Sequence, residues 1–355
     1  MKKDLVEFGF GCRGIGRALP PLIIAEMSGN HNQSLGRALE IVEAAAKTGV
    51  HALKIQTYTA DTMTLNLNDE DFSVGDPNSQ WAGKSLYELY DEAHTPWEWH
   101  KAIFDRANEL GIMAFSTPFD DTAVDFLESL KVPFYKIASQ ENTDIPLIRR
   151  VARTGKPVIM STGMATLDEL TEAVSVVRDA GCTELTLLKC TSTYPANPEN
   201  TNISTIQHMR ELFKCEVGLS DHTMGIGVSV ASVSLGATVI EKHFTLSRQD
   251  GGVDSDFSME PTEMKQLVVE TGRAWRSFGS VTYGATKAEE ESLKYRRSLY
   301  VARDIKAGEV LTTENLRAVR PGYGLATKYF DDVLGCKVIS DVCMGTPMSW
   351  NLIKR

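Results

Sequence analysis

The stretch GLSDHTMGIGVSVASVSLGATVIEKHF (218–244) contains two short apolar runs, and each run ends in polar and charged residues. Short runs rich in β-branched and apolar residues that are bounded by polar clusters are typical of buried strands. We therefore expect strands over CEVGLSDH (215–222) and TVIEKHF (238–244). His222 and His243 close these two runs, twenty-one residues apart. The stretch thus predicts one repeat of a parallel strand–helix–strand architecture.

Six further runs of the same kind precede this stretch: LIIAEM (22–27), ALKIQTY (52–58), MAFSTPF (113–119), FYKIASQE (134–141), VIMSTG (158–163) and LTLLKCTS (185–192). Segments with helical periodicity stand between them. One example is SLGRALEIVEAAAKTG (34–49), which ends at Gly49, a usual helix terminator. Eight alternations of strand and helix predict an α/β fold, a (β/α)8 TIM barrel.

A doubly wound open sheet is the alternative to the barrel, because periodicity does not show closure. That fold places a glycine-rich phosphate loop after its first strand. Here the first predicted strand is followed by AEMSGNHN, which contains no such loop. The count of eight strands therefore favours the barrel.

We expect three segments along the chain: a barrel over residues 1–280, a polar linker over 281–297 and a compact β-rich tail over 298–355. The tail contains a faint repeat, DIKAGEVLT from Asp304 and DVCMGTPMS from Asp341, which predicts a small two-fold module. Within the barrel, the turn-rich connection 60–94 carries Trp81 and is unusually long. Connections of this length are usually lids or rim structures.

The composition excludes several classes of function. A net charge of -10 without long basic runs argues against nucleic acid and anionic membranes as partners. The start, MKKDLVEFGFGCRG, is interrupted by charges, so we expect no signal peptide and no membrane segment. The six cysteines show no CxxC pairing, which favours reduced thiols and a cytoplasmic location.

Polar residues gather at the ends of the predicted strands. Barrel enzymes place their chemistry at these carboxyl ends. Lysines such as Lys54 and Lys136 supply positive charge there, and hydroxyls such as Ser161 and Ser220 supply directed donors. Because the protein is acidic overall, cations collected in one place predict a site for a small anion that carries a phosphate or a carboxylate.

The two histidines allow two interpretations. Adjacent parallel strands lie about 4.8 Å apart, so imidazoles at neighbouring strand ends are close enough to share a divalent ion. Hydrogen-bonded histidines of the barrel rim fit the spacing equally well. Likewise, Glu26 and Glu141 suit either proton transfer or salt bridges across the barrel mouth, and the strand-end lysines suit either ligand binding or strand capping.

Several motifs resemble the sialic acid synthase family of phosphoenolpyruvate-condensing enzymes. In chain order they are IIAEMSGNHN, LKIQTYT, FSTPFD, YKIASQE, STGMATLDE, LLKCTSTYP, GLSDHTMGIG, VIEKHFTL and RPGYG. The resemblance covers nearly the whole chain, and the tail resembles the antifreeze-like (SAF) domain of that family. It implies small-molecule substrates, a divalent manganese or magnesium ion, and a homodimer in which the tail reaches the partner's barrel.

The resemblance also implies roles for individual residues. His222 and His243 match metal ligands, and Glu26 matches a carboxylate for proton transfer, a catalytic role that Glu141 or Asp254 is suited by type to share. Residues that match phosphoenolpyruvate contacts are Lys54, Thr117, Lys136, Ser139, Ser161, Ser192 and Ser220. Residues that match contacts to the acceptor sugar are Gln56, Glu141, Tyr194, Asp254 and Arg320.

The segment after the second histidine, RQDGGVDSDFSMEP, predicts the acceptor sugar. Its GGVDS resembles the branch of the family that makes pseudaminic acid, and Ser192 replaces an Asn that is common in enzymes acting on N-acetylmannosamine. The expected acceptor is 2,4-diacetamido-2,4,6-trideoxy-L-altrose. N,N'-Diacetyllegionaminic acid and N-acetylneuraminate are the alternative products. A phosphorylated acceptor or a non-enzymatic carbohydrate-binding protein are the more distant hypotheses.

Overall fold

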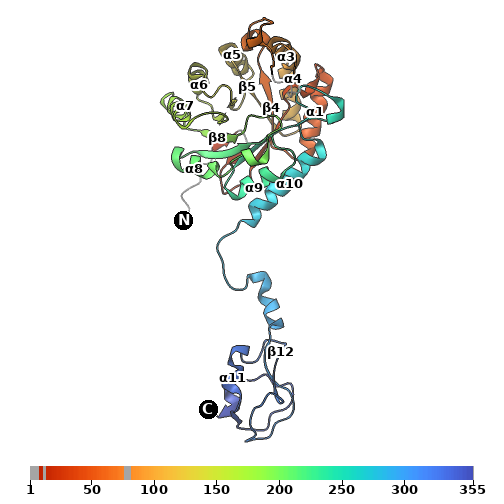
Figure 1. Cartoon of the computed structure of the whole chain (residues 1–355), viewed down its shortest axis with the longest axis vertical. Coiled ribbons are helices and arrows are strands. Elements are labelled where there is room, and N and C mark those ends of the chain that lie inside the picture. Colours follow the sequence, from red (N-terminus) through yellow and green to blue (C-terminus); the bar gives the residue numbers. More distant parts are fainter. Residues whose placement is uncertain (1–7, 11–12, 76–80, 355) are drawn as a thin grey trace. The chain divides into compact units, whose positions relative to one another are not determined.

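The computed structural model describes residues 8–10, 13–75 and 81–354, and it divides into two compact units, Met1–Gly279 and Ser280–Arg355. The first unit contains a closed barrel of eight parallel strands in the order β10-β3-β4-β5-β6-β7-β8-β9 (Figure 1). The predicted (β/α)8 barrel is therefore confirmed. Its strands are β3 Leu22–Glu26, β4 Ala52–Thr57, β5 Met113–Pro118, β6 Tyr135–Ile137, β7 Val158–Ser161, β8 Leu185–Cys190, β9 Glu216–Ser220 and β10 Val239–His243.

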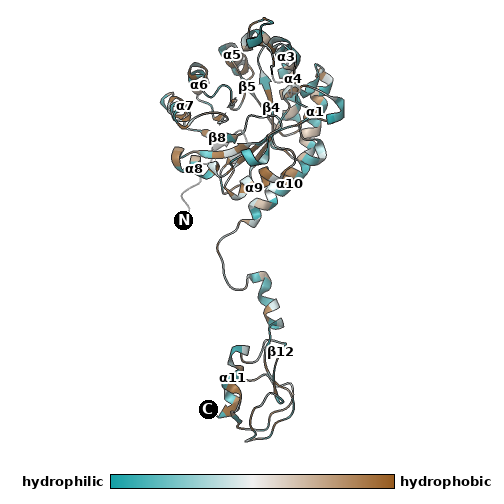
Figure 2. Ribbon diagram, viewed as in Figure 1, coloured by the Kyte–Doolittle hydropathy of each residue, from teal (hydrophilic) through white to brown (hydrophobic). Residues whose placement is uncertain are grey.

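Helices surround the barrel (Figure 1) and pack one apolar face against it. Helices such as α7 carry both hydrophobic and hydrophilic residues (Figure 2), as amphipathic helices of this kind do. The helices are α1 Leu35–Thr48, α2 Ala60–Met63, α3 Leu86–Ala93, α4 His100–Glu109, α5 Asp121–Ser129, α6 Ile145–Ala152, α7 Leu167–Asp179, α8 Thr205–Phe213, α9 Gly227–Ser234 and α10 Pro261–Ser277. Local signals fix their ends: Gly49 closes α1 in a left-handed conformation, and Thr166 caps α7 with a capping box.

Side chains along each strand alternate between the barrel interior and the helix layer. Leu22 and Ile24 therefore lie in an apolar layer inside the barrel, whereas Glu26, next on the same face, lies at the carboxyl end. The same order holds for Val239, Glu241 and His243 in β10. The barrel interior is thus apolar toward the amino ends of the strands and polar at their carboxyl ends. This polar layer forms the floor of the site.

The described part of the long connection, 60–75 and 81–94, contains helices α2 and α3. Trp81 Nε1 donates a hydrogen bond of 2.8 Å to the carbonyl oxygen of Val253. This bond links the connection to the segment that follows β10.

The structure adds detail to two of the predicted segments. The strand predicted over 134–141 ends at Ile137, because Glu141 N donates to the Ala138 carbonyl oxygen and turns the chain. The segment predicted as a linker contains a 3-10 helix, Lys287–Tyr295.

The second unit contains strands β11 Ser298–Val301, β12 Leu316–Val319, β13 Lys337–Val338 and β14 Ile353–Lys354, and the short helix α11 Phe330–Val333. Its faint repeat is visible as a reciprocal pair of hydrogen bonds. Asp304 accepts from Met344 N, and Asp341 accepts from Ala307 N. Ile305 and Val342 pair between them and belong to the unit's own apolar core.

The cysteines at 182, 190, 215, 336 and 343 are all free thiols, as expected. Cys12 and most of the N-terminal stretch for which we expect no signal peptide lie outside the described residues. Across 8–10, 13–75 and 81–354, no helix is both long enough and apolar enough to cross a bilayer. A strand pair, β1 Phe8–Phe10 with β2 Arg13–Ile15, precedes the barrel, and Ile15 packs into its interior apolar layer.

Candidate active site

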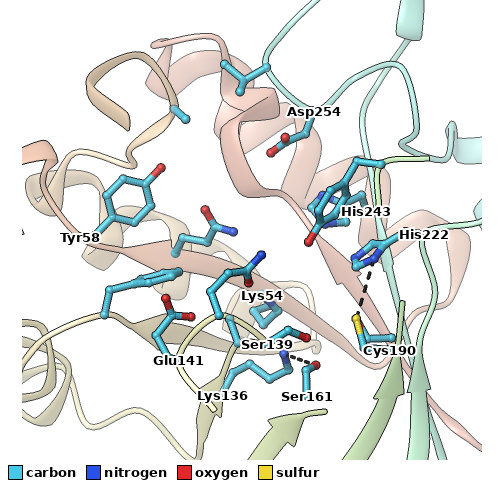
Figure 3. Close-up of a pocket in the computed structure, with 18 of the residues that line it drawn as sticks. Lys54, Tyr58, Lys136, Ser139, Glu141, Ser161, Cys190, His222, His243 and Asp254 are labelled. Carbon is cyan, nitrogen blue, oxygen red and sulfur yellow. Dashed lines mark hydrogen bonds between the residues drawn. The ribbon is translucent and has the colours of Figure 1, made fainter. Parts of the chain in front are cut away.

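A pocket opens at the carboxyl ends of the barrel strands (Figure 3). It brings together residues from seven strands or the turns after them, as the barrel topology requires. Eleven of the fifteen predicted site residues line it: Lys54, Gln56, Lys136, Ser139, Glu141, Ser161, Tyr194, Ser220, His222, His243 and Asp254.

Two buried lysines form the cationic floor of this pocket. Lys54 Nζ lies 2.6 Å from Glu26 Oε2 and 3.9 Å from Glu241 Oε2. Lys136 Nζ lies 3.5 Å from Glu241 Oε1 and donates to Ser161 Oγ at 2.8 Å. Because buried charges require partners, these carboxylates balance the two ammonium groups in the protein without substrate.

The pKa values in this cluster follow from burial and from the neighbouring charges. Burial raises the pKa of Glu26 to about 7, although Lys54 opposes the rise. Burial also acts to raise the pKa of Glu241, but Lys136 and Lys54 outweigh it and hold that pKa below its usual value. Burial lowers the pKa of Lys136, and Glu241 only partly offsets this. Glu241 is therefore the ionised partner of the lysines, and Glu26 is the carboxyl group able to gain and lose a proton near neutral pH.

The two histidines lie close together, with ring centroids 5.3 Å apart. His222 Nδ1 lies 2.9 Å from the Thr191 carbonyl oxygen, which only accepts hydrogen bonds, so Nδ1 carries the proton. His243 Nδ1 lies 3.1 Å from Ser28 Oγ, and Ser28 in turn donates to Asp254. The Ser28 oxygen therefore accepts from His243 Nδ1. In the neutral form of either ring, this leaves the lone pair on Nε2.

This arrangement fits a divalent metal ion in its chemistry. Metal-binding histidines usually donate their second ring nitrogen to a carbonyl or a carboxylate-linked group. Burial and the nearby charges of His222 and Lys54 hold the pKa of His243 well below its usual value, so the ring is neutral, as ligation requires. Within the described residues, no cluster of three or more His, Cys, Asp or Glu side chains forms a protein-only cage. A metal ion here would thus keep most of its coordination positions for substrate and water.

Unpartnered carboxylate oxygens also point to a missing ligand. Glu26 Oε1 and Glu141 Oε2 are buried and have no hydrogen-bond partner within the described chain. A buried polar atom without a partner costs free energy unless a ligand or water satisfies it. Both atoms are therefore suited to contact a substrate or its protons.

A second buried ion pair forms between the residues that directly precede the two histidines and positions them. Lys242 Nζ lies 3.0 Å from Asp221 Oδ2 and donates to the Thr223 carbonyl oxygen at 2.6 Å. Asp221 also accepts from Ser229 Oγ on α9. Since Asp221 and Lys242 directly precede His222 and His243, this pair fixes the ends of the two strands that carry the imidazoles.

Four predicted site residues do not line the pocket. Glu26 and Thr117 lie beneath it and contact Lys54, which donates to Thr117 Oγ1 at 3.3 Å. Ser192 Oγ lies 3.7 Å from the Cys190 sulfur at the pocket's edge. Arg320 is an exposed residue of the second unit. His31 is fully buried and packs edge-on against Trp99 outside the pocket lining.

Several residues of the site are not among those to which the sequence assigned a role. Glu241 bridges both lysines, and it stands two residues before His243, so strand alternation alone places it on the same face. Cys190 contacts His222 Nδ1 at 3.9 Å. Burial acts to raise the thiol pKa, but His222 outweighs it and brings that pKa to about 7. Tyr58 and Phe119, which directly follow β4 and β5, also line the pocket.

A closed (β/α)8 barrel that gathers two lysines, hydroxyls, carboxylates and paired imidazoles at its carboxyl end defines a barrel enzyme for an anionic small molecule. The chain belongs to the NeuB family, whose model matches residues 41–283, and a SAF domain model matches residues 296–354. The family resemblance of the motifs is therefore confirmed.

Individual relatives extend this similarity over nearly the full length. The chain is 44% identical to the pseudaminic acid synthase of Campylobacter jejuni, over 91% of this chain and 94% of that protein. It is 41% identical to the pseudaminic acid synthase of Helicobacter pylori, over 95% of this chain and 98% of that protein. Among solved structures, it resembles the N-acetylneuraminic acid synthetase of Leptospira borgpetersenii in complex with citrate. That match has a TM-score of 0.71 and 32% identity, and it covers 81% of this chain and 94% of the other.

Proposed function

We propose that the protein condenses phosphoenolpyruvate with 2,4-diacetamido-2,4,6-trideoxy-L-altrose to give pseudaminic acid and phosphate. The observation that carries this proposal is one pocket that combines a lysine and hydroxyl floor with two imidazoles whose Nε2 atoms are available. The identity above 40% to two pseudaminic acid synthases supports this acceptor over N,N'-diacetyllegionaminic acid or N-acetylneuraminate chemistry.

Lys54, Lys136 and Ser161 hold the phosphate of phosphoenolpyruvate in this proposal, with Thr117, Ser139, Ser192 and Ser220 as further contacts. The phosphate replaces Glu241 as the partner of the lysines, so binding exchanges one buried ion pair for another. Ammonium groups that are already in place stabilise charge without reorganisation.

The open-chain aldehyde of the sugar must become electrophilic before the weakly nucleophilic methylene carbon attacks it. A divalent manganese or magnesium ion on Nε2 of His222 and His243 would polarise the aldehyde oxygen as a Lewis acid. Gln56, Glu141, Tyr194 and Asp254 orient the sugar. Arg320 of a partner subunit completes the acceptor site in a homodimer.

The reaction balances as follows. The methylene carbon forms a bond to the aldehyde carbon, and the aldehyde oxygen gains a proton. Water adds to the former enol carbon and loses one proton, and the hydroxyl so formed then gives its remaining proton to the departing phosphate as the carbon–oxygen bond to phosphate breaks and the ketone forms. Glu26, with its pKa near 7, is suited to accept and return protons in these steps, with Glu141 or Asp254. General acid–base catalysis of this kind contributes about 10²- to 10⁴-fold in rate.

The proposal is tested by phosphate release from phosphoenolpyruvate and by mass spectrometry of the product from a panel of 2-acetamido and 2,4-diacetamido sugars. We expect release only when both a diacetamido sugar and Mn²⁺ or Mg²⁺ are present. Phosphate release that continues in EDTA would refute the metal assignment. Calorimetry that detects sugar binding without affinity for phosphoenolpyruvate would support the carbohydrate-binding alternative.

The histidine assignment has its own matched pair of variants. We expect His222→Ala to lower kcat by more than the about 10- to 100-fold that loss of a supporting residue costs, with an unchanged circular dichroism spectrum. His208→Ala, an exposed histidine on α8, is the control and should retain the wild-type rate. Full turnover by His222→Ala would contradict the assignment.

A further inference from the structure

The side of the pocket away from the histidines carries a group of apolar and aromatic side chains beside the carboxylate of Glu141. Tyr58 packs edge-on against Phe119, with ring centroids 5.2 Å apart, and against Tyr90 at 5.9 Å. Met63 and Leu89 line the same pocket from α2 and α3. We call Tyr58, Met63, Leu89, Tyr90 and Phe119 the aromatic wall. In Figure 3, Tyr58 and Glu141 lie on one side of the pocket, and His222 and His243 lie on the other.

The aromatic wall contains two phenol hydroxyls. Tyr58 is 2% exposed and Tyr90 is partly buried, and both side chains line the pocket. Burial and the carboxylate of Asp254 hold the pKa of Tyr58 well above its usual value, so the group stays a neutral donor. A phenol donor inside an apolar surface is suited to a carbonyl oxygen of a ligand.

The aromatic wall has no positive charge of its own. Among the described residues that line the pocket, the lysines are Lys54 and Lys136, and both lie in the floor with Glu241 and Ser161. A phosphate placed against the wall would lose its hydration without a cation to replace it, and a hydroxyl placed against Phe119, Met63 or Leu89 would find no polar partner there, which is costly. Methyl groups and acetamido groups suit this wall. Both present apolar carbon, and the acetamido group adds a carbonyl oxygen.

We propose that the aromatic wall is the specificity subsite for the deoxygenated, acetamido-bearing end of the acceptor, and that it selects the C6 methyl over a C6 hydroxyl. This inference rests on the proposed condensing activity. It places the aldehyde end of the sugar toward the histidines and the methyl end against Phe119 and Tyr58. The aromatic wall thereby distinguishes a 6-deoxy diacetamido sugar from its hydroxylated counterpart.

The test compares two acceptors that differ only at C6: 2,4-diacetamido-2,4,6-trideoxy-L-altrose and 2,4-diacetamido-2,4-dideoxy-L-altrose. We expect the wild-type kcat/KM to favour the 6-deoxy sugar by about 10- to 200-fold, the range for one small group in an apolar pocket. Phe119→Ala should lower kcat/KM for the 6-deoxy sugar by about 10-fold and reduce the preference, while KM for phosphoenolpyruvate is unchanged. Phe119→Leu should restore part of the preference, because it refills the space with apolar carbon.

Phe126→Ala is the matched control. Phe126 is a partly buried phenylalanine that stacks on Trp97 outside the pocket lining, so its loss should leave the preference at the wild-type ratio. Wild-type protein that uses both sugars equally would overturn the inference. The same holds if Phe119→Ala lowers kcat/KM equally for both. Absence of phosphate release with every acceptor would instead refute the proposed function itself.

Discussion

Glu141 combines a buried carboxylate oxygen with a raised pKa. It lies in the turn after β6, where Oε2 is buried without a hydrogen-bond partner in the described chain. Burial raises its pKa to about 7, although Lys136 opposes the rise. The folded protein therefore binds a proton at Glu141 more tightly than the unfolded chain does.

Because Glu141 binds its proton more tightly in the folded protein, its contribution to stability falls as the pH rises. A raised carboxyl pKa stabilises the fold fully below about pH 4.5, and the contribution is lost as the pH rises through about 7. Glu141→Gln cannot ionise, so we expect the variant to gain up to about 3 kcal/mol on wild type between pH 5 and pH 8. Urea unfolding at the two pH values measures the difference. Glu211→Gln, at an exposed position on α8, is the control. Its stability should equal that of wild type within about 0.5 kcal/mol at both pH values.

The residue types of the site were predictable, but their partners were not. Alternation along a strand indicates which residues share a face, so it predicts His243 and Glu241 on one side and Lys242 on the other. It does not predict that Lys242 pairs with Asp221, because that contact forms between two strand ends and α9. Tyr58 and Phe119 were missed because an aromatic residue after a strand is equally typical of ordinary packing.

At the scale of elements, the contact between β9 and β10 depends on a glycine. A Cβ added at Gly218 would lie 2.2 Å from the Val239 carbonyl oxygen and 2.8 Å from Leu188 Cδ2. The first of these atoms is backbone and has no freedom to rotate away. Because β9 and β10 lead into His222 and His243, any separation of the two strands also moves the imidazoles apart.

We expect Gly218→Ala to destabilise the barrel by about 3 kcal/mol through overpacking. Gly272→Ala, inside α10, is the control. Its added Cβ meets only Arg276 Nη1 at 3.6 Å, so we expect a gain of about 0.5–1 kcal/mol from helix propensity. Urea unfolding of both variants measures this contrast. Equal stability of Gly218→Ala and wild type would show that the two strands are able to separate without cost.

The number and order of the barrel strands were predictable because each strand has its own apolar run. The residues at which the strands begin and end were less predictable. FYKIASQE has the composition of one long strand, yet a turn at Ala138 ends it early and directs Ser139 and Glu141 into the pocket. That turn contacts the segment that follows the neighbouring strand β7, where Gly163 N donates to Ser139 Oγ at 3.2 Å.

At the scale of the whole molecule, the second unit has its own core and its own internal two-fold pattern. Its composition predicted a small β-rich module, but no pattern within one chain specifies what an exposed arginine of that module contacts. The resemblance to the family implies that Arg320 acts on the barrel of a partner subunit. This implication concerns a dimer, so it requires a test between chains.

Mixing two inactive variants provides that test. In a dimer of His222→Ala with Arg320→Ala, the barrel of the Arg320→Ala chain has both histidines and receives an intact Arg320 from its partner. The barrel of the His222→Ala chain lacks His222 and receives no Arg320. Random exchange makes about half of the dimers mixed, and one site in each is complete, so we expect about a quarter of the wild-type rate. Phosphate release measured after denaturation and refolding of the mixture gives this value. If Arg320 acts on the barrel of its own chain, every site in the mixture lacks one group, and the rate stays at the level of the separate variants.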